Sequence, residues 1–311
     1  MKNLFKKYGI YFGFLFILIL FSILSPHFLR SKNISNILVQ SSILAIIAVG
    51  ETIVILTGGI ELSVGSVVAF TSLSSAFMIV EMGFPIVLGI IIALLLSGLI
   101  GLVNGVIISY GRVPPFIATL GMMSIARGGA LALKSGQPIS GIPLGYERLA
   151  ITEIFGVIPI FILYTIFIYL LGYVFLVRTR GGRYIYAIGG NRDSARLSGV
   201  KVRVYETLAY VICGLLAGVG GILLTARLDY ATPIAGIGYE LDVIAATVIG
   251  GTSLAGGEGF IFGTLLGAVM IGTLRNGLTL LNVSSYYQQI IIGVVIIGAV
   301  FLDRIKAIKR D

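Results

Sequence analysis

Basic side chains outnumber acidic ones in this chain, and many of them gather in one segment near its middle. The segment comprises residues 178–204, and its basic residues are Arg178, Arg180, Arg183, Arg192, Arg196, Lys201 and Arg203. Without a nucleophile, general base or metal ligand beside them, guanidinium and ammonium groups bind other surfaces through charge but break no bonds. The pattern therefore predicts a docking surface for a water-soluble partner and not a catalytic site.

Residues that ordinarily carry out catalysis or bind metals are isolated from one another. The only cysteine is Cys213, which excludes both a disulfide within the chain and a redox pair. The only histidine, His27, has no second metal ligand near it in the sequence. Because an enzyme needs a convergent set of such groups, we predict no catalytic residue, no cofactor-binding residue and no metal site.

The elements that must position these residues are almost entirely apolar. Of the 311 residues, 57% are hydrophobic and only 11% are charged, and the mean hydropathy is +1.06. Soluble domains carry about 25% charged residues, so this composition predicts a membrane protein. The net charge of +9 then reflects basic residues in loops and termini and not nucleic-acid binding.

Apolar runs long enough to cross a bilayer follow one another along the chain. We predict an all-α polytopic membrane protein with one transmembrane domain over residues 1–311 and about ten helical passages, some of them broken or re-entrant. The predicted passages are 8–25, 37–57, 64–80, 84–109, 115–133, 156–177, 205–226, 240–250, 260–281 and 286–302. The run 240–250 is too short to span unaided, and eight spans with two re-entrant segments would fit equally.

The charge distribution predicts that both termini lie in the cytoplasm. Lys2, Lys6 and Lys7 precede the first apolar run, which is longer than a signal-peptide core and lacks a small-residue cleavage site. We therefore expect a retained first helix in the cell membrane. An even number of passages returns the C-terminus to the cytoplasm, and most of the 22 Lys and Arg residues then lie on that side.

Two glycine-rich segments interrupt the apolar pattern in the same way. Residues 58–66 and 250–259 each contain G-G-x-x-L-x-x-G between two apolar runs. Irregular backbone at membrane depth survives only where protein or a water-filled cavity covers it, and transporters use broken helices near their pathways. Each segment is therefore either a pathway element or a tight interhelical turn in which glycine allows positive φ and close packing.

Several charged residues fall within or beside apolar runs, where a charge is costly and marks a functional site or a buried pair. They are Glu51, Glu61, Arg127, Asp242 and Arg275. The side chain of Arg127 could instead extend to the membrane interface. Glu51 and Asp242 are the candidate relay carboxylates if the chain were an ion-coupled secondary transporter, although the basic loop would then lack a purpose.

Five segments occur in an order typical of one transporter family. They are Gly58–Ser66, Pro114–Gly121 with Arg127-Gly128, 187–191 continuing through 197–200, Gly250–Gly263, and 274–278 followed by Gln288-Gln289. On these residues the chain resembles, from about Gln40 to Asp303, the permease subunits of ribose-type ATP-binding cassette (ABC) importers. The resemblance implies a fold similar to the type II importers.

The resemblance also implies a function and a set of partners. Such permeases import a monosaccharide (a ribose-like pentose, a hexose or a related polyol), and they work with a second permease copy, identical or not. A separate ABC ATPase holds the ATP and Mg, and an extracytoplasmic binding protein delivers the sugar. This chain has no G-x-x-x-x-G-K-[ST] segment, which agrees with an ATPase on another subunit. Relatives in the wider superfamily carry nucleosides or other small polar solutes, so such a substrate remains the alternative.

Within the basic loop, residues 191–199 are typical of a short helix. Asn191 is suited to the N-cap, Asp193 to the first turn and Gly199 to the C-cap. We expect residues 189–200 to insert into the ATPase; the alternative is an ordinary loop that follows the positive-inside bias. The predicted coupling residues are Gly189, Gly190, Asn191, Arg192, Asp193, Ala195, Arg196, Leu197, Ser198 and Gly199.

The route for a sugar needs weak polar contacts that the substrate can leave. The predicted pathway or gate residues are Gln40, Glu51, Gly58, Gly59, Ser63, Gly65, Asn104, Thr119, Gly250, Gly251 and Asn276. The alternative for each polar member is an ordinary hydrogen bond between packed helices.

Overall fold

The computed structural model describes residues 2–156 and 158–308, most of them helical. The helices are α1 (Lys2–Leu24), α2 (Ser31–Leu56), α3 (Val64–Ala76), α4 (Ile86–Ser109), α5 (Pro115–Leu133), α6 (Leu144–Ile151), α7 (Ile160–Tyr173), α8 (Arg180–Gly190), α9 (Arg192–Leu197), α10 (Val202–Leu228), α11 (Tyr239–Ile249), α12 (Ile261–Leu280) and α13 (Ser285–Ile308). The π-helical turns η1 (Phe77–Glu81) and η2 (Val174–Arg178) extend α3 and α7. The all-α prediction is confirmed.

Seven helical segments of the described residues are long and apolar enough to cross a membrane. They are Ser31–Leu56, Val64–Glu81, Ile86–Ser109, Pro115–Leu133, Ile160–Arg178, Val202–Leu228 and Ile261–Leu280. α1 and α13 contain the shorter apolar stretches Ile10–Leu24 and Ser285–Gly298. α11 has 11 residues and is therefore about 16 Å long, roughly half of a bilayer core. A multi-pass membrane protein is confirmed, whereas the total of ten passages stays a prediction.

Helices α2 and α10 form the centre of the bundle. In their apolar stretches, 83% and 67% of the residues are buried, against 28% in α4 and 22% in α5. Glycines allow the close approach of α4 to α10, since a Cβ on Gly101 or Gly214 would overlap the backbone of the other helix. The outer helices expose large apolar side chains such as Leu95 and Ile125, which is the surface that lipid solvates.

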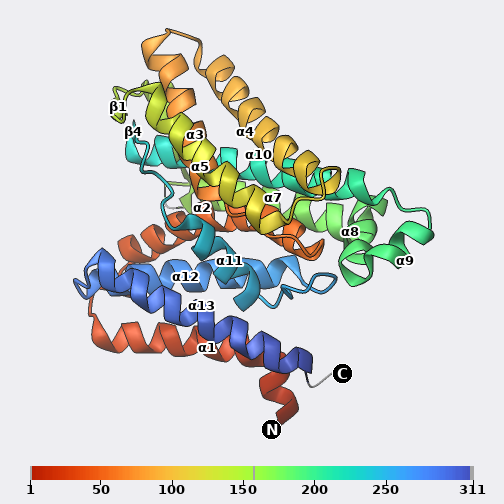
Figure 1. Ribbon diagram of the computed structural model, residues 1–311. Coiled ribbons are helices and arrows are strands. Elements are labelled where there is room, and N and C mark those ends of the chain that lie inside the picture. Colours follow the sequence, from red (N-terminus) through yellow and green to blue (C-terminus); the bar gives the residue numbers. More distant parts are fainter. Residues whose placement is uncertain (1, 157, 309–311) are drawn as a thin grey trace.

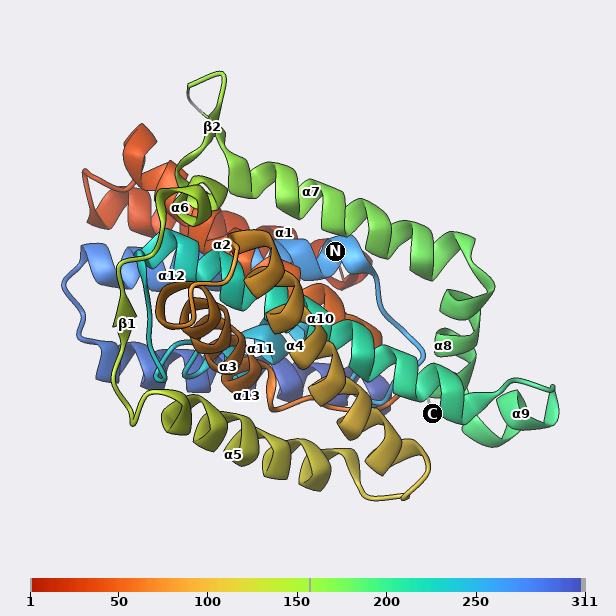
Figure 2. The same ribbon diagram turned by 90° about the horizontal axis from the view of Figure 1, so that it is seen from above.

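The helices lie side by side and define two ends of the bundle (Figure 1). α8 and α9 project at one end, and the start of α1 and the end of α13 lie toward the same end. At the other end, β1 (Ile139–Ser140) pairs antiparallel with β4 (Tyr230–Ala231). A second pair joins β2 (Glu153–Ile154) to β3 (Ile158–Pro159). Seen from above, α5 and α7 lie along opposite edges of the bundle (Figure 2).

Most predicted passages coincide with helices to within a few residues. The largest differences are at α1, which begins at Lys2 and not at 8, at α2, which begins at Ser31 and not at 37, and at α13, which continues to Ile308 and not to 302. Polar turns continue these helices beyond their apolar runs, so hydropathy does not detect them. For the same reason the apolar pattern does not predict the short helices α6 and α8.

Candidate functional site

The basic segment folds into two short helices joined at Asn191. Thr179 caps α8 by accepting a hydrogen bond from the Gly182 amide at 3.2 Å. Asn191 caps α9 as predicted: its side-chain oxygen accepts from the Ser194 amide at 2.8 Å, and Asp193 occupies the first turn. α9 ends at the cap residue Ser198, and Gly199 follows with φ +83°. The predicted glycine is therefore one residue beyond the cap, where a left-handed residue closes the helix.

The predicted coupling residues divide into an exposed set and an anchored set. Leu197, at the end of α9, is 84% exposed, an unusual exposure for a large apolar side chain beside charged neighbours. Asp193 and Arg196 form an exposed ion pair at 3.3 Å. Ala195 is buried in a small apolar cluster with Ile188 of α8 and Val202 of α10. The exposed set is Gly190, Asn191, Arg192, Asp193, Arg196, Leu197, Ser198 and Gly199.

Gly189 packs α8 against the end of α2 and the second glycine-rich segment at once. A Cβ at Gly189 would overlap the Leu56 carbonyl oxygen at the end of α2 and the Gly257 amide nitrogen. Those two groups bond to each other, with the Gly257 amide donating to Leu56 at 3.0 Å. Tyr186 of α8 also donates to the Gly259 carbonyl at 3.0 Å. Burial raises the pKa of Tyr186, so its hydroxyl remains a proton donor.

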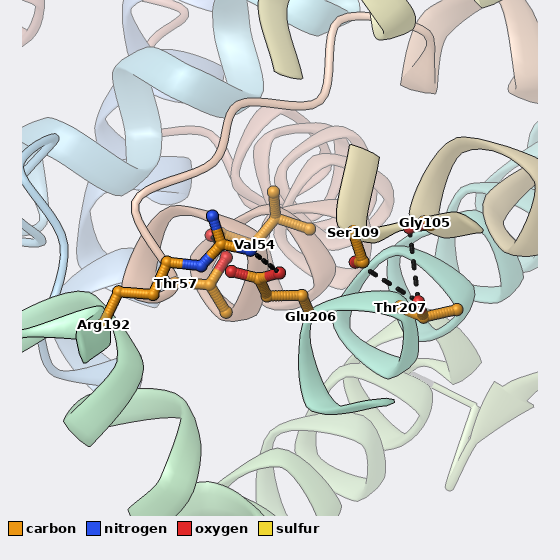
Figure 3. A network of polar contacts seen from close by, with 7 residues as sticks. All are labelled: Val54, Thr57, Gly105, Ser109, Arg192, Glu206 and Thr207. Atoms are coloured by element: carbon orange, nitrogen blue, oxygen red, sulfur yellow. Dashed lines mark hydrogen bonds and ion pairs between the residues drawn. The ribbon is translucent and has the colours of Figure 1, made fainter. Parts of the chain in front are cut away.

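An ion pair joins α9 to the start of α10. Arg192 donates to the carboxylate of Glu206 at 2.7 Å, and Glu206 is almost fully buried. Thr207, the next residue, donates to the Gly105 carbonyl of α4 at 3.2 Å. Figure 3 shows these residues in one polar network with Ser109, and with Val54 and Thr57 at the end of α2. A displacement of α9 would therefore reach α10 first and then α4.

The first glycine-rich segment is a buried irregular connection between α2 and α3. The Glu61 amide donates to the carboxylate of Glu51 at 3.2 Å. The Glu61 carboxylate in turn accepts from the Ser63 hydroxyl at 2.6 Å and from the Asn104 amide at 2.7 Å. Thr119 of α5 lies at this connection, and its hydroxyl is 3.3 Å from the Ile60 carbonyl. The structure thus gathers Glu51, Ser63, Asn104 and Thr119 around Glu61 and the Ile60 carbonyl. Gly58 and Gly59 belong to the same connection, but their amides bond back to Ile55 and Val54 of α2, and Gly58 is exposed.

The other predicted pathway residues lie away from this cluster. Asn276 exchanges two hydrogen bonds of 2.9 Å with Asn33 and so joins α12 to α2. Gly65 lies against Gly236, and Gly250 lies against Gly263 at the start of α12. Gln40 is half-buried on α2, and Gly251 is exposed with φ +94°. Asn276, Gly65 and Gly250 therefore join helices, whereas a role in transport stays a prediction for all five.

The predicted short passage is a broken helix. Irregular backbone from 232 to 238 precedes α11, and the second glycine-rich segment follows it. Arg127 of α5 donates to the Pro233 and Ala235 carbonyls at 2.6 and 2.8 Å, so it holds the irregular part and does not extend to the interface. Asp242, which is buried, pairs at 2.7 Å with Arg275 of α12, whose side chain is 31% exposed.

Sequence reasoning missed several residues of these contacts. Glu206 lies in an apolar run, and its charge there is the signal that could have identified it. Tyr186 and Leu56 carry no such signal, because their contacts depend on tertiary packing. Among the described residues, no group of three or more His, Cys, Asp or Glu side chains could hold a metal ion.

Comparisons with known proteins agree with this architecture. Residues 33–300 match the family described as branched-chain amino acid transport system / permease component. The chain is 48% identical over 293 residues to the ribose import permease protein RbsC of Escherichia coli (strain K12), which covers 92% of this chain and 89% of that relative. No solved structure matches the chain at a significant level.

Two further relatives carry the names of other sugars. The D-allose transport system permease protein AlsC of Escherichia coli (strain K12) is 38% identical over 300 residues, with 96% of this chain and 92% of the relative covered. The galactose/methyl galactoside import permease protein MglC of Salmonella typhimurium is 39% identical over 324 residues, with 98% and 96% covered. The resemblance noted in the sequence is confirmed.

Proposed function

The chain belongs to the branched-chain amino acid transport system / permease component family, and on that premise we propose that it is the permease subunit of an ATP-driven monosaccharide importer. The named substrates of its relatives are ribose, D-allose, galactose and methyl galactoside. A ribose-like pentose is therefore the first candidate substrate, and a hexose is the second.

The observation that carries the proposal is the way in which α9 is attached to the rest of the bundle. Its outer surface presents Leu197 and the Asp193–Arg196 pair to solvent, as a docking element requires. Its base is joined to α10 through Arg192 and Glu206. Through Gly189 of α8, the same element contacts the end of α2, just before the first glycine-rich segment, and the second segment at Gly257. Movement imposed on α9 from outside would therefore reach the irregular backbone inside the bundle.

Energy comes, in this proposal, from an ABC ATPase that docks on α8 and α9 and holds ATP and Mg. This chain lacks a phosphate-binding loop of the G-x-x-x-x-G-K-[ST] type. The rival, an ion-coupled transporter, would use Glu51 or Asp242 as a relay. Both carboxylates have structural partners instead, since Glu51 accepts from the Glu61 amide and Asp242 pairs with Arg275.

The sugar would pass beside the broken helix α11 and the connection from Gly58 to Ser63. Irregular backbone at this depth has carbonyl and amide groups outside regular helical hydrogen bonds, and these could exchange their present partners for a sugar's hydroxyls. The outer side of α5 and of the segment 232–241 is apolar. A second permease copy would pack against this side, and the pathway would lie between the two copies. A sugar-binding protein would dock at the end that carries β1 and β4.

The end that carries α8 and α9 faces the cytoplasm in this proposal, together with both termini. The positive-inside bias supports this orientation, because the basic residues of 178–204 lie there.

Uptake of radiolabelled ribose tests the function. Cells that lack their own ribose uptake would express this chain together with a candidate ABC ATPase and a candidate sugar-binding protein. Ribose should accumulate against its gradient only when all components are present, and allose, galactose and a nucleoside would be the competitors. Accumulation by this chain alone, or inhibition by the nucleoside only, would contradict the proposal.

Co-purification of the ATPase tests the docking site. Leu197→Asp places a charge on the exposed end of α9 and should abolish co-purification. Phe155→Asp is the matched control, because Phe155 is 93% exposed in the turn between β2 and β3. Equal retention of the ATPase by both variants would exclude α9 as its docking element.

A further inference from the structure

A basic cleft lies beside the coupling element, between the end of α4, α9 and the first turn of α10. Its volume is about 620 Å³. Arg192 and Arg196, which line it, are paired with Glu206 and Asp193. The charges of Arg192 and Arg196 are therefore already neutralised, whereas those of the other basic residues in the cleft are not.

Arg112, Lys201 and Arg203 line the same cleft. In the part of the chain that the structure describes, none of the three forms an ion pair. The guanidinium of Arg203 lies over the ring of Tyr110, 5.4 Å from its centroid, which fixes its position at the mouth of the cleft. Asp193 also lines the cleft but is paired with Arg196, so Arg112, Lys201 and Arg203 leave positive charge there that can bind an anion.

An apolar groove continues from this cleft along the membrane-spanning part of α4 and α10. It has a volume of about 350 Å³ and is lined by Leu102, Val106, Tyr110, Val204 and Thr207. Tyr110 and Val204 line both the groove and the cleft, so the two cavities adjoin. The combined site is basic at the end of the bundle and apolar toward its middle.

We propose that the cleft and groove together bind one anionic phospholipid. Arg112, Lys201 and Arg203 contact its phosphate, and an acyl chain lies against Leu102 and Val106. An acidic segment of a soluble partner would satisfy the cations but could not enter the groove, because the groove lies on the lipid-facing side of two spans. The phosphate of a bound phospholipid pairs with the basic cleft, and its acyl chain fills the apolar groove. The lipid also contacts the base of α9.

Native mass spectrometry of the purified full chain tests the assignment. Phosphatidylglycerol and phosphatidylcholine with identical acyl chains are titrated in turn, and their apparent affinities are compared. Each Lys or Arg near an anionic lipid contributes about a fivefold factor in affinity, so wild type should prefer phosphatidylglycerol by at least about 10-fold. The triple variant R112Q/K201Q/R203Q should bind the two lipids about equally.

Two further variants separate charge from shape. R178Q/R180Q/R183Q removes the same charge from exposed positions outside the cleft, and it should keep the wild-type preference. Val106→Trp fills the groove. It should weaken the binding of long-chain phosphatidylglycerol and leave the binding of dihexanoyl phosphatidylglycerol unchanged.

Three results would overturn the proposal. The first is an unchanged lipid preference in R112Q/K201Q/R203Q. The second is displacement of the lipid by inorganic phosphate at similar concentration, which would assign the site to a free anion. The third is loss of ATPase co-purification in this variant with lipid binding unchanged, which would assign the cleft to the protein partner.

Discussion

Replacing Gly189 by alanine should loosen the contact of α8 with the end of α2 and with the second glycine-rich segment. The new Cβ would overlap the backbone atoms of Leu56 and Gly257, neither of which can rotate away as a side chain would. Overpacking of this kind costs about 1–3 kcal/mol, and loss of the Gly257–Leu56 hydrogen bond costs about 0.5–1.5 kcal/mol. The higher helix propensity of alanine offsets about 0.5–1 kcal/mol of this destabilisation. The net expectation is a loss of about 1–3 kcal/mol.

The adjacent glycine provides the matched control. Gly190 is also in α8, but a Cβ there meets nothing within 4 Å. Gly190→Ala should therefore leave stability unchanged or raise it by up to about 1 kcal/mol. Two neighbouring substitutions of the same type thus have opposite expected signs, and only the packing of Gly189 distinguishes them.

Thermal unfolding can be followed through the chain's only cysteine. Cys213 is fully buried, so a thiol-reactive fluorophore reports unfolding without further engineering. The Tm of Gly189→Ala should fall by about 2–6 °C, since 1 kcal/mol corresponds to roughly 2 °C in a chain of this size. If Gly189→Ala melts at or above the wild-type temperature, α8 does not pack on Leu56 and Gly257 as described.

Further expectations concern the ion pairs and the orientation of the chain. Glu206→Gln should keep ATPase binding but lower the sugar imported per ATP hydrolysed, because Arg192 then loses its charged partner on α10; an unchanged ratio argues against this connection. Arg275→Gln should destabilise the protein by about 3–5 kcal/mol because it leaves the buried Asp242 unpaired, and Asp242→Asn should cost less because the Arg275 side chain is 31% exposed; the double variant should lose less than the sum of the two, and strict additivity argues against the pair. Single cysteines at Arg148 and Arg192, in a background without other cysteines, should be labelled from opposite sides of the membrane, and labelling from one side would overturn the proposed orientation.

Most of the secondary structure could be predicted from the sequence for a simple physical reason. Backbone polar groups in lipid must bond within the segment, so an apolar run of sufficient length becomes a helix. The predicted run 115–133 coincides with α5, and 240–250 differs from α11 by one residue at each end. Asn191 was identifiable because a cap bonds to residues only a few positions away.

The candidate site could be predicted only in part. Glu51, Ser63, Asn104 and Thr119 were identifiable as polar residues in apolar surroundings, and they do converge. Asn276 has the same sequence character but pairs with Asn33 instead. Polarity at membrane depth shows that a partner is needed but does not specify which one.

The sequence by itself determined that this chain is a multi-pass helical membrane protein, and where its basic segment and glycine-rich breaks occur. Local bonding and transfer of apolar side chains into lipid depend on the order of residues alone. Only the tertiary structure decided that Gly189 meets Leu56 and Gly257, and that Asp242 meets Arg275. Such contacts join segments far apart in the chain, so they depend on which helices pack together and at what depth.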